Sequence, residues 1–230
     1  TDLTGIVSAG DTYVIKAHVT LADIFGASNE TGLKSAGSPV DSDTIYLMSS
    51  TGNGIFATYY YLNDEFGLFG GNGWRSITDT ATDYSNLVVG PDDGLIVRRI
   101  ASGDLTTVVS GNVSTTDLSR DLPNGFSLIA YPFPVDVTLS NSGIYSATNG
   151  YVSTGSSADS DVVYVINPNG TFTSYYYLTD EFGLFGGNGW RRVSDFNTPM
   201  DNTVLTVGSS IIIKHIGTGL AWTDAVPFSN

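Results

Sequence analysis

The chain contains the same seventeen-residue block twice. Residues 59–75 read YYYLNDEFGLFGGNGWR and residues 175–191 read YYYLTDEFGLFGGNGWR, so sixteen of the seventeen positions agree. The twenty-four residues after each block, 76–99 and 192–215, agree at only five positions. A duplication whose flanks have drifted has therefore kept one segment almost unchanged, which indicates that this segment performs the same role twice. Recent local gene conversion is the alternative explanation.

Shorter matches extend the duplication over almost the whole chain. Residues 41–46, DSDTIY, match residues 159–164, DSDVVY, at an offset of 118, whereas the block repeats at an offset of 116. A two-residue insertion or deletion therefore lies in the turn between them. We predict two tandem domains, residues 1–115 and 116–230, each of a common domain size. The polar segment Ser114–Arg120 is predicted to be the linker.

Each copy is predicted to be all-β, as a sandwich or barrel of many short strands. An Asn-Gly pair lies between the first two predicted strands, at Asn53-Gly54 and again at Asn169-Gly170, and it favours a type I′ hairpin turn in which both residues have positive φ. Thr20 to Phe25 is compatible with one helical turn. Runs of β-branched and aromatic residues predict strands at Thr44–Met48, Ile55–Leu62, Leu95–Ile100, Leu105–Val109 and Ile211–Ile216.

The block begins with a tyrosine strand and continues into a glycine-rich loop. Tyr59 and Tyr61 share one face of the strand and Tyr60 and Leu62 the other, so one face is core and the other faces solvent or an interface. Residues 64–73, DEFGLFGGNG, carry four glycines, which indicates positive φ or close backbone approach. The loop either tucks its aromatic side chains under the end of the sheet or presents them as an exposed apolar fingertip.

The block supplies a matched set of candidate interaction residues. Trp74 is expected in the core with its N–H satisfied, and Arg75 is expected to pair with Asp64 or Glu65 and so to close the loop. The candidates are Tyr59, Tyr61, Asp64, Glu65, Phe66, Leu68, Phe69, Trp74 and Arg75 in the first copy, and Tyr175, Tyr177, Asp180, Glu181, Phe182, Leu184, Phe185, Trp190 and Arg191 in the second.

An acidic Asp-Ser-Asp motif precedes a predicted strand in both copies. Its aspartates, Asp41, Asp43, Asp159 and Asp161, are either solvated turn residues or ligands of Ca²⁺, which takes six to eight oxygen ligands. No other cofactor is expected.

The two histidines do not correspond between the copies, because His18 aligns with Asp136 and His215 with Arg99. A duplicated active site would not lose its base in alternate copies, so Ser-His-Asp chemistry is disfavoured. Both histidines are interpreted as ordinary surface or strand residues. Adjacent carboxylates in the block diverge on an extended chain, so they do not suit a glycosidase, which needs two facing carboxyl groups. We expect the chain not to be an enzyme.

Charge and composition exclude several partners. Nine basic against twenty-three acidic residues give a formal net charge of −14, whereas nucleic acid and anionic membrane need a basic face. The absence of cysteine excludes disulfides and thiolate metal sites. No apolar run approaches the roughly eighteen residues of a membrane helix. Thr1 at the start fits either a removed signal peptide or a sequence that begins late.

Several short motifs together resemble a family of uncharacterised exported proteins from Verrucomicrobia and related bacteria. The matching segments are Asp43–Tyr46, Thr58–Tyr61, Gly73–Arg75 and Gly94–Arg99. The second copy departs at the last segment, where Ser210–His215 reads SIIIKH. The resemblance implies export and a β-rich repeat fold, and it implies no particular activity.

These observations leave three hypotheses for function. The leading one is a non-enzymatic extracellular or cell-surface structural protein, such as a filament, sheath or surface-layer subunit. It would self-associate head to tail through its loops, or by adding the N-terminal segment Leu3–Val7 to a neighbour's sheet. The alternative is a carbohydrate-binding or adhesion module in which the tyrosines and Trp74 form exposed platforms for a glycan. A hydrolase whose carboxylates come from distant strands is the third.

Overall fold

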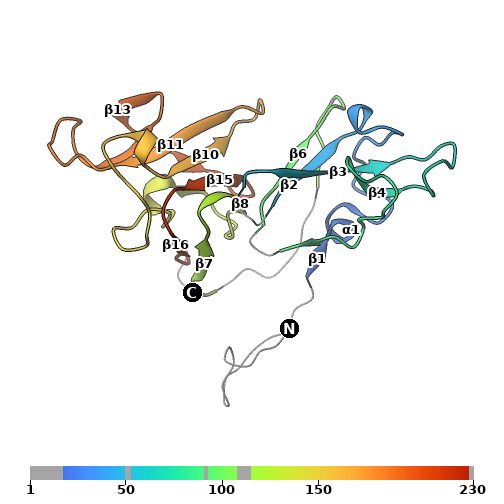
Figure 1. The fold of residues 1–230 in the computed structure, drawn as a ribbon, viewed down its shortest axis with the longest axis horizontal. Helices are drawn as coiled ribbons and strands as arrows, with labels where there is room; N and C mark the ends of the chain where they lie inside the picture. Colours follow the sequence, from blue (N-terminus) through green and yellow to red (C-terminus); the bar gives the residue numbers. More distant parts are fainter. Residues whose placement is uncertain (1–17, 50–52, 91–92, 108–114, 228–230) are drawn as a thin grey trace, which may run out of the picture.

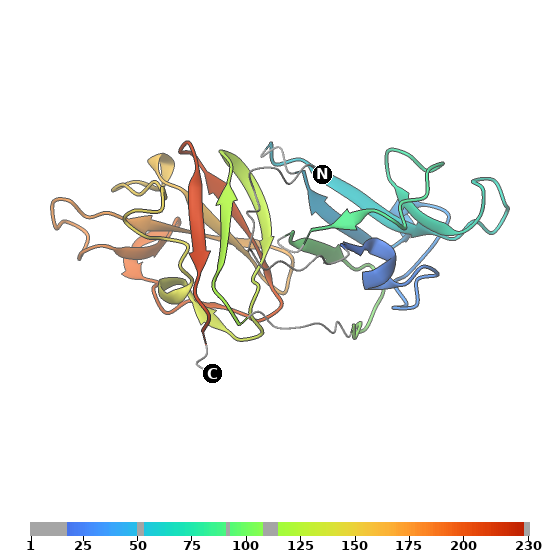
Figure 2. The same cartoon turned by 90° about the horizontal axis from the view of Figure 1, so that it is seen from below.

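The computed structural model describes residues 18–49, 53–90, 93–107 and 115–227. Within these ranges the fold is all-β, with one short α-helix, so the predicted fold class is confirmed. Residues 18–107 are called the first half below, and residues 115–227 the second half. Figures 1 and 2 show the two halves side by side along the long axis, each built around one sheet. The division into two domains after residue 115 stays a prediction.

The first half is organised around a four-stranded antiparallel sheet in the order β4-β3-β2-β6. Its strands are β2 (Thr44–Met48), β3 (Phe56–Leu62), β4 (Gly73–Ser76) and β6 (Leu95–Arg98). The smaller elements are β1 (Val19–Thr20), which pairs with β5 (Val88–Val89), the helix α1 (Leu21–Phe25) and the 3₁₀ turn η1 (Pro39–Asp41).

The second half contains a six-stranded antiparallel sheet in the order β13-β12-β11-β10-β15-β8. Its strands are β8 (Gly125–Ala130), β10 (Val162–Ile166), β11 (Phe172–Leu178), β12 (Gly189–Arg192), β13 (Asp195–Pro199) and β15 (Ser210–His215). Two further pairs are β7 (Leu118–Leu122) with β16 (Leu220–Asp224), and β9 (Val137–Thr138) with β14 (Val204–Leu205); η2 (Leu139–Asn141) and η3 (Ser157–Asp159) are 3₁₀ turns.

The predicted strands in the sheets agree with the structure within two residues at each end, and α1 occupies the predicted helical turn. Thr20 begins that helix because its side chain accepts the Asp23 N–H while the Asp23 carboxylate accepts the Thr20 N–H. The predicted linker Ser114–Arg120 is wrong in its second part, since β7 starts at Leu118 and pairs with β16 about a hundred residues later in the chain. That pairing leaves no local signal in the sequence.

Other predictions on short segments have mixed outcomes. The predicted strand at Leu105–Val109 is not found in its described part, residues 105–107, and the rest of that range lies outside the described residues. The segment Leu3–Val7, proposed for strand addition, also lies outside them.

The predicted type I′ turns are wrong, because only the glycine of each Asn-Gly pair has positive φ. Gly54 and Gly170 have φ of 72° and 78°, whereas neither Asn53 nor Asn169 does. In the second half the Asn167 N–H donates to the Thr171 carbonyl over 2.8 Å, so three residues lie between the bonded pair. A three-residue hairpin loop requires the left-handed conformation only at its last position, which glycine occupies here.

The core of each half lies on one face of its sheet. Tyr59 and Tyr61 are buried together with Trp74, as the alternation of the tyrosine strand predicts. Tyr60 and Leu62, on the opposite face, are buried as well. This end of β3 is therefore covered on both sides and offers no solvent-facing aromatic pair.

The second half encloses the larger core, between its six-stranded sheet and the β7–β16 pair. Ile211 and Ile213 on β15 are fully buried against Leu220 and Trp222 on β16. The Trp222 Nε1–H donates to the Ser142 carbonyl over 2.8 Å, so the indole is buried without losing its hydrogen bond.

The two halves meet where β8, the edge strand of the larger sheet, approaches the start of β6. The Gly94 N–H donates to the Leu128 carbonyl over 3.1 Å, and Asp93 forms an antiparallel bridge with Ile129. Nearby, the Ser210 hydroxyl donates to the Leu95 carbonyl over 3.3 Å. This contact covers part of an otherwise unpaired sheet edge.

We expect Gly94→Ala to destabilise the protein, because an added Cβ would lie 2.8 Å from the backbone carbon and 2.9 Å from the backbone nitrogen of Ile129. Such overpacking costs roughly 1–3 kcal/mol of unfolding free energy. The measurement is chemical denaturation followed by tryptophan fluorescence.

Gly219→Ala is the matched control, since a Cβ at Gly219 meets nothing within 4 Å. It should be neutral or slightly stabilising, because alanine restricts the unfolded chain. Equal stability of the two variants would show that the halves do not need their close approach at Gly94.

Candidate functional site

The repeated block forms the same hairpin in both halves. Tyr61 pairs with Trp74 across β3 and β4, and Tyr177 pairs with Trp190 across β11 and β12. The connecting segments are named loop 1, residues 63–72, and loop 2, residues 179–188. Figures 1 and 2 show the two loops at opposite ends of the long axis, loop 1 in teal and loop 2 in orange.

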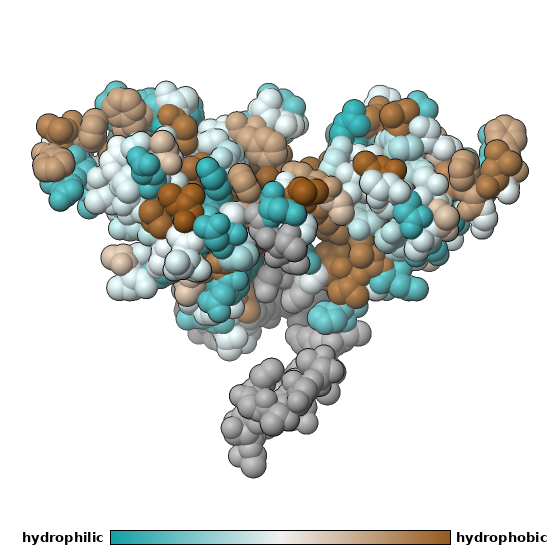
Figure 3. All heavy atoms as spheres, viewed as in Figure 1, coloured by the Kyte–Doolittle hydropathy of each residue, from teal (hydrophilic) through white to brown (hydrophobic). Residues whose placement is uncertain are grey.

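The apolar tips of both loops are exposed. Phe66 and Leu68 have 80% and 74% of their surface accessible, and Phe182 and Leu184 have 78% and 73%. Figure 3 shows hydrophobic residues gathered at both outer ends of the molecule. Of the two alternatives for this loop, the exposed fingertip is therefore the observed one, and the aromatic residues are not tucked under the sheet.

Loop 1 is held in shape by the carboxylate of its first acidic residue. Asp64 accepts the backbone N–H groups of Leu68, Phe69 and Gly71 over 2.8, 2.9 and 2.8 Å. The Asp64 N–H in turn donates to the Asn72 side chain over 2.7 Å. A carboxylate that accepts several backbone donors makes strong, charge-assisted bonds, so the exposed tip is preorganised.

Loop 2 repeats this arrangement with the same geometry. Asp180 accepts the N–H groups of Leu184, Phe185 and Gly187 over 2.8, 2.9 and 2.8 Å, and the Asp180 N–H donates to Asn188 over 2.7 Å. The conserved sequence of the block thus corresponds to a conserved internal scaffold for the tip.

The hydrogen bonds lower the pKa of both aspartates. Desolvation acts to raise the pKa of Asp64 and Asp180, but the backbone N–H donors of each loop outweigh it. A carboxyl group with a lowered pKa stabilises the folded loop at pH values above its ordinary pKa, and it loses this effect as the pH falls through the lowered value. We therefore expect the two carboxylates to stabilise their loops at neutral pH and to lose this effect in strong acid.

Arginine closes the base of each loop by a route that the sequence did not predict. Arg75 donates to the carbonyl groups of Gly71 and Trp74 over 3.1 and 3.2 Å and lies 3.5 Å from the carboxylate of Asp83. Its expected pairing with Asp64 or Glu65 is wrong, because the Asp64 oxygens are occupied by the loop's own N–H groups. Glu65 stays exposed at the tip.

The corresponding Arg191 makes the same kind of contacts, with the carbonyl groups of Gly187 and Trp190 at 2.9 and 3.0 Å. Both guanidinium groups are buried and face backbone carbonyls. They are structural residues and are not available to a ligand.

The aromatic residues proposed as sugar platforms are not exposed. Trp74 is fully buried and donates its indole N–H to the Gly26 carbonyl over 2.9 Å. Tyr59 and Tyr61 lie beside it in the core, and so do Tyr175 and Trp190 in the second half.

Tyr177 is partly buried and stacks on Tyr145, with ring centroids 3.4 Å apart. None of these aromatic residues offers a free ring face to a glycan.

The two tips differ in one contact. Phe185 of loop 2 packs edge-on against Phe196 of β13, with ring centroids 5.5 Å apart. Thr80 stands at the corresponding position in the first half, so Phe69 of loop 1 lacks this ring partner. Loop 1 therefore presents the freer apolar surface.

The Asp-Ser-Asp motifs are structural in both halves. Asp43 is buried, and its carboxylate accepts the N–H groups of Lys34 and Ile100 over 2.9 and 2.8 Å as well as the Arg99 side chain over 3.3 Å. Desolvation acts to raise the pKa of Asp43, but these hydrogen bonds outweigh it and lower the pKa. Asp41 is exposed.

Asp161 occupies the same place in the second half. It accepts the N–H groups of Val152 and Ile216 over 2.9 and 2.8 Å and contacts His215 Nδ1 at 2.7 Å, while Asp159 is exposed. Across the described ranges, no cluster of three or more acidic or histidine residues could hold a metal ion. The alternative that these aspartates ligate Ca²⁺ therefore finds no support among the described residues, and the carboxylates of Asp43 and Asp161 already accept N–H donors.

His215 is the last residue of β15, in agreement with a strand residue, and it lies buried in the core beside Asp161. The signal that could have located it is its alignment with Arg99, because both side chains contact the equivalent aspartate. His215 Nε2 is buried without a hydrogen-bond partner among the described residues, and Gly217 lies against the ring. Within residues 18–49, 53–90, 93–107 and 115–227, no hydroxyl group bonds to His215 Nε2, so the Asp-His pair lacks the geometry of a catalytic triad there.

A second buried acid lies in the second half. Asp224 on β16 is buried close to Arg120 and Tyr131, and the Arg120 guanidinium lies over the Trp222 ring at 4.6 Å. Desolvation raises the pKa of Asp224 to about 6, against the opposing pull of Arg120. The group is therefore expected to bind a proton in mild acid more readily than an exposed aspartate.

Comparison of the chain with protein-family models, with curated proteins and with solved structures found no match. In the described part of the chain, no helix is long and apolar enough to cross a membrane.

We expect Asp64→Ala to loosen loop 1 without unfolding the sheet, because the variant removes the acceptor of three backbone N–H groups. Hydrogen exchange should show protection lost at Leu68, Phe69 and Gly71, and retained in β3. Asp180→Ala is the matched variant for loop 2. Unchanged protection at those three amides would contradict the proposed role of the carboxylate.

Asp224→Asn should raise the unfolding free energy at pH 7 and have little effect near pH 4. The folded state holds a proton on Asp224 up to about pH 6, whereas the unfolded chain releases it near pH 4. The wild type therefore loses stability as the pH rises between these values, and the amide does not. Denaturation curves at several pH values test this, and a pH-independent difference between the two proteins would refute it.

Proposed function

We propose that this chain is a non-enzymatic structural protein that self-associates through its loops, as a subunit of an extracellular or cell-surface assembly. The observation that carries the proposal is the pair of nearly identical, preorganised apolar tips at opposite ends of one molecule (Figure 3). Exposed apolar groups set on a rigid scaffold mark interaction sites.

The energetics favour docking of the tips on a protein surface. Burying one Phe or Leu side chain contributes roughly 1.5–3 kcal/mol, and each tip presents two that are almost fully exposed in the isolated chain. Because Asp64 and Asp180 already order the loops, association needs little further ordering of the backbone. Two tips on one chain also allow a molecule to bridge two neighbours.

The glycan-binding alternative is less well supported. A glycan-binding module would need its tyrosine and tryptophan platforms in solvent, whereas the tyrosines and tryptophans of the block lie in the cores or stack on other rings. Export and an extracellular or surface location are part of the proposal. They are supported by the resemblance to exported repeat proteins and by the acidic composition.

Replacing both tip phenylalanines, Phe66→Ser with Phe182→Ser, should abolish self-association and leave the fold intact. Loss of contacts of this size weakens an interface by at least about thirtyfold in Kd. The measurement is light scattering after size exclusion over a concentration series, with circular dichroism to check the fold.

The matched control is Val40→Ser in η1, since Val40 is an apolar residue outside the loops with 74% of its surface exposed. It should assemble like the wild type. A wild type that stays monomeric at all concentrations, or a double variant that assembles normally, would refute the proposal.

A further inference from the structure

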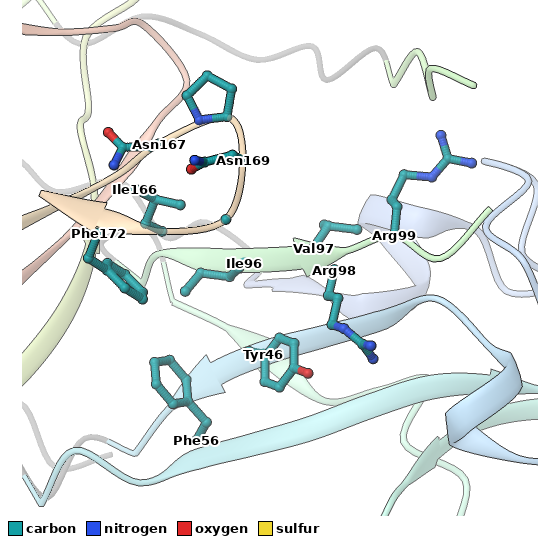
Figure 4. A pocket seen from close by; sticks show the side chains of 12 residues that line it. Tyr46, Phe56, Ile96, Val97, Arg98, Arg99, Ile166, Asn167, Asn169 and Phe172 are labelled. Atoms are coloured by element: carbon teal, nitrogen blue, oxygen red, sulfur yellow. The ribbon is translucent and has the colours of Figure 1, made fainter. Parts of the chain in front are cut away.

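A groove lies between the two halves, on the faces of the sheets opposite to their cores. Its larger part is about 760 Å³ and is lined by residues of β2, β3 and β6 together with the β10–β11 hairpin. A smaller part of about 310 Å³ continues it past Met48, Phe126 and Ile212. Figure 4 shows Tyr46, Phe56 and Ile96 on one side and Ile166 with Phe172 on the other.

The groove is lined by equivalent residues from the two copies of the duplication. Tyr46 and Phe56 meet edge-on with ring centroids 5.9 Å apart, and Tyr164 and Phe172 meet edge-on at 6.5 Å. Tyr46 aligns with Tyr164 and Phe56 with Phe172, at the offsets of 118 and 116 that relate the copies. The duplication has thus placed two matching aromatic pairs around one hollow.

The groove also carries positive charge in a strongly acidic chain. Arg98, which is exposed, lines its first-half side (Figure 4), whereas the charge of the neighbouring Arg99 is paired with Asp43. Arg98 is one of only nine basic residues in the chain, whose net charge is −14. An occupant with an apolar tip and an acidic side chain would therefore match the groove in both respects, since complementary charge guides partner choice.

We propose that this groove receives loop 1 of a second copy of the chain, which deepens and rests on the self-association proposed above. Loop 1 has the matching chemistry, because Phe66 and Leu68 project beside the exposed carboxylate of Glu65. The two apolar side chains enter the aromatic groove and Glu65 meets Arg98. A volume of about 760 Å³ is within the range of sites that enclose a group of this size.

The contact joins different molecules and not two parts of one. The loops lie at the outer ends of the chain, whereas the groove lies between the halves (Figures 1 and 2). Each loop is fixed by its hairpin and its aspartate, so neither can fold back to the groove. Joining a tip to a different surface of the next copy is a heterologous contact, which generates an open polymer or a ring.

Loop 1 is preferred to loop 2 as the occupant. Phe185 of loop 2 already packs on Phe196. Docking of loop 2 would therefore have to break this ring contact or bury both rings in the interface. One groove for each chain also accommodates only one of the two tips, which leaves loop 2 free in a filament.

The test uses two full-length variants that are defective at opposite ends of the proposed contact. The loop variant is Phe66→Ser with Leu68→Ser, and the groove variant is Phe172→Glu, at a position with 47% of its surface exposed. Each alone should be monomeric by sedimentation velocity at concentrations where the wild type assembles, with Kd raised at least about thirtyfold. Mixed together they should form a one-to-one dimer, because the intact loop of one docks in the intact groove of the other.

A second pair of variants tests the contact without relying on correct folding of the Phe172→Glu variant. Arg98→Glu should weaken assembly by opposing Glu65, and adding Glu65→Arg in the same chain should restore it. Phe182→Ser with Leu184→Ser is the matched control in loop 2 and should assemble like the wild type.

The outcomes separate this inference from the proposed function. If the loop variant fails to assemble while the groove variant assembles normally, or if the mixture stays monomeric, self-association through the loops stands and the groove is not the receptor. If only the loop 2 variant fails, the assignment to loop 1 is overturned. If the wild type does not assemble at all, the proposed function itself fails.

Discussion

The sheets of this protein depend on one interaction made in both halves, a buried aspartate that collects N–H groups from separate segments. Asp43 directly precedes β2, and its carboxylate accepts the N–H group of Lys34 and that of Ile100, which follows the end of β6. Asp161 directly precedes β10 in the second half, and its carboxylate accepts the N–H group of Val152 and that of Ile216, which follows the end of β15. A carboxylate has several acceptor sites and binds N–H donors more strongly than a neutral group does, so one side chain fixes the ends of two paired strands together with a third segment outside their ladder.

The same chemistry orders the functional surface. Asp64 and Asp180 each bind three N–H groups of one loop and so hold an apolar tip in solvent, where the hydrophobic effect alone would collapse it. The acidic composition of the chain is thus partly architectural. Four of its aspartates accept N–H groups from backbone outside the sheet ladders.

Divergence between the copies has followed these constraints. The partner of the buried aspartate is Arg99 in one half and His215 in the other, and both supply an N–H donor at the same place. The face that carries Tyr46 and Phe56 has been kept in the second half as Tyr164 and Phe172, although those residues lie outside the nearly identical block. Both copies therefore preserve the loop, and both preserve the aromatic pair that lines the groove. This shared preservation supports a contact between a loop and the groove.

The sequence by itself determined the duplication, the all-β class and the strands β2, β3, β6 and β15, because alternation and β-branched runs are local properties that a short window records. It also located the repeated loop, with its glycines and apolar residues. The burial of Trp74 is confirmed as predicted. The tertiary structure alone decided that Phe66 points into solvent, because exposure depends on what packs against a residue from elsewhere in the chain. It also decided the roles of Asp43 and His215, since their partners lie more than fifty residues away along the chain. The groove could not be predicted for the same reason, as it exists only where β8 brings the two halves together.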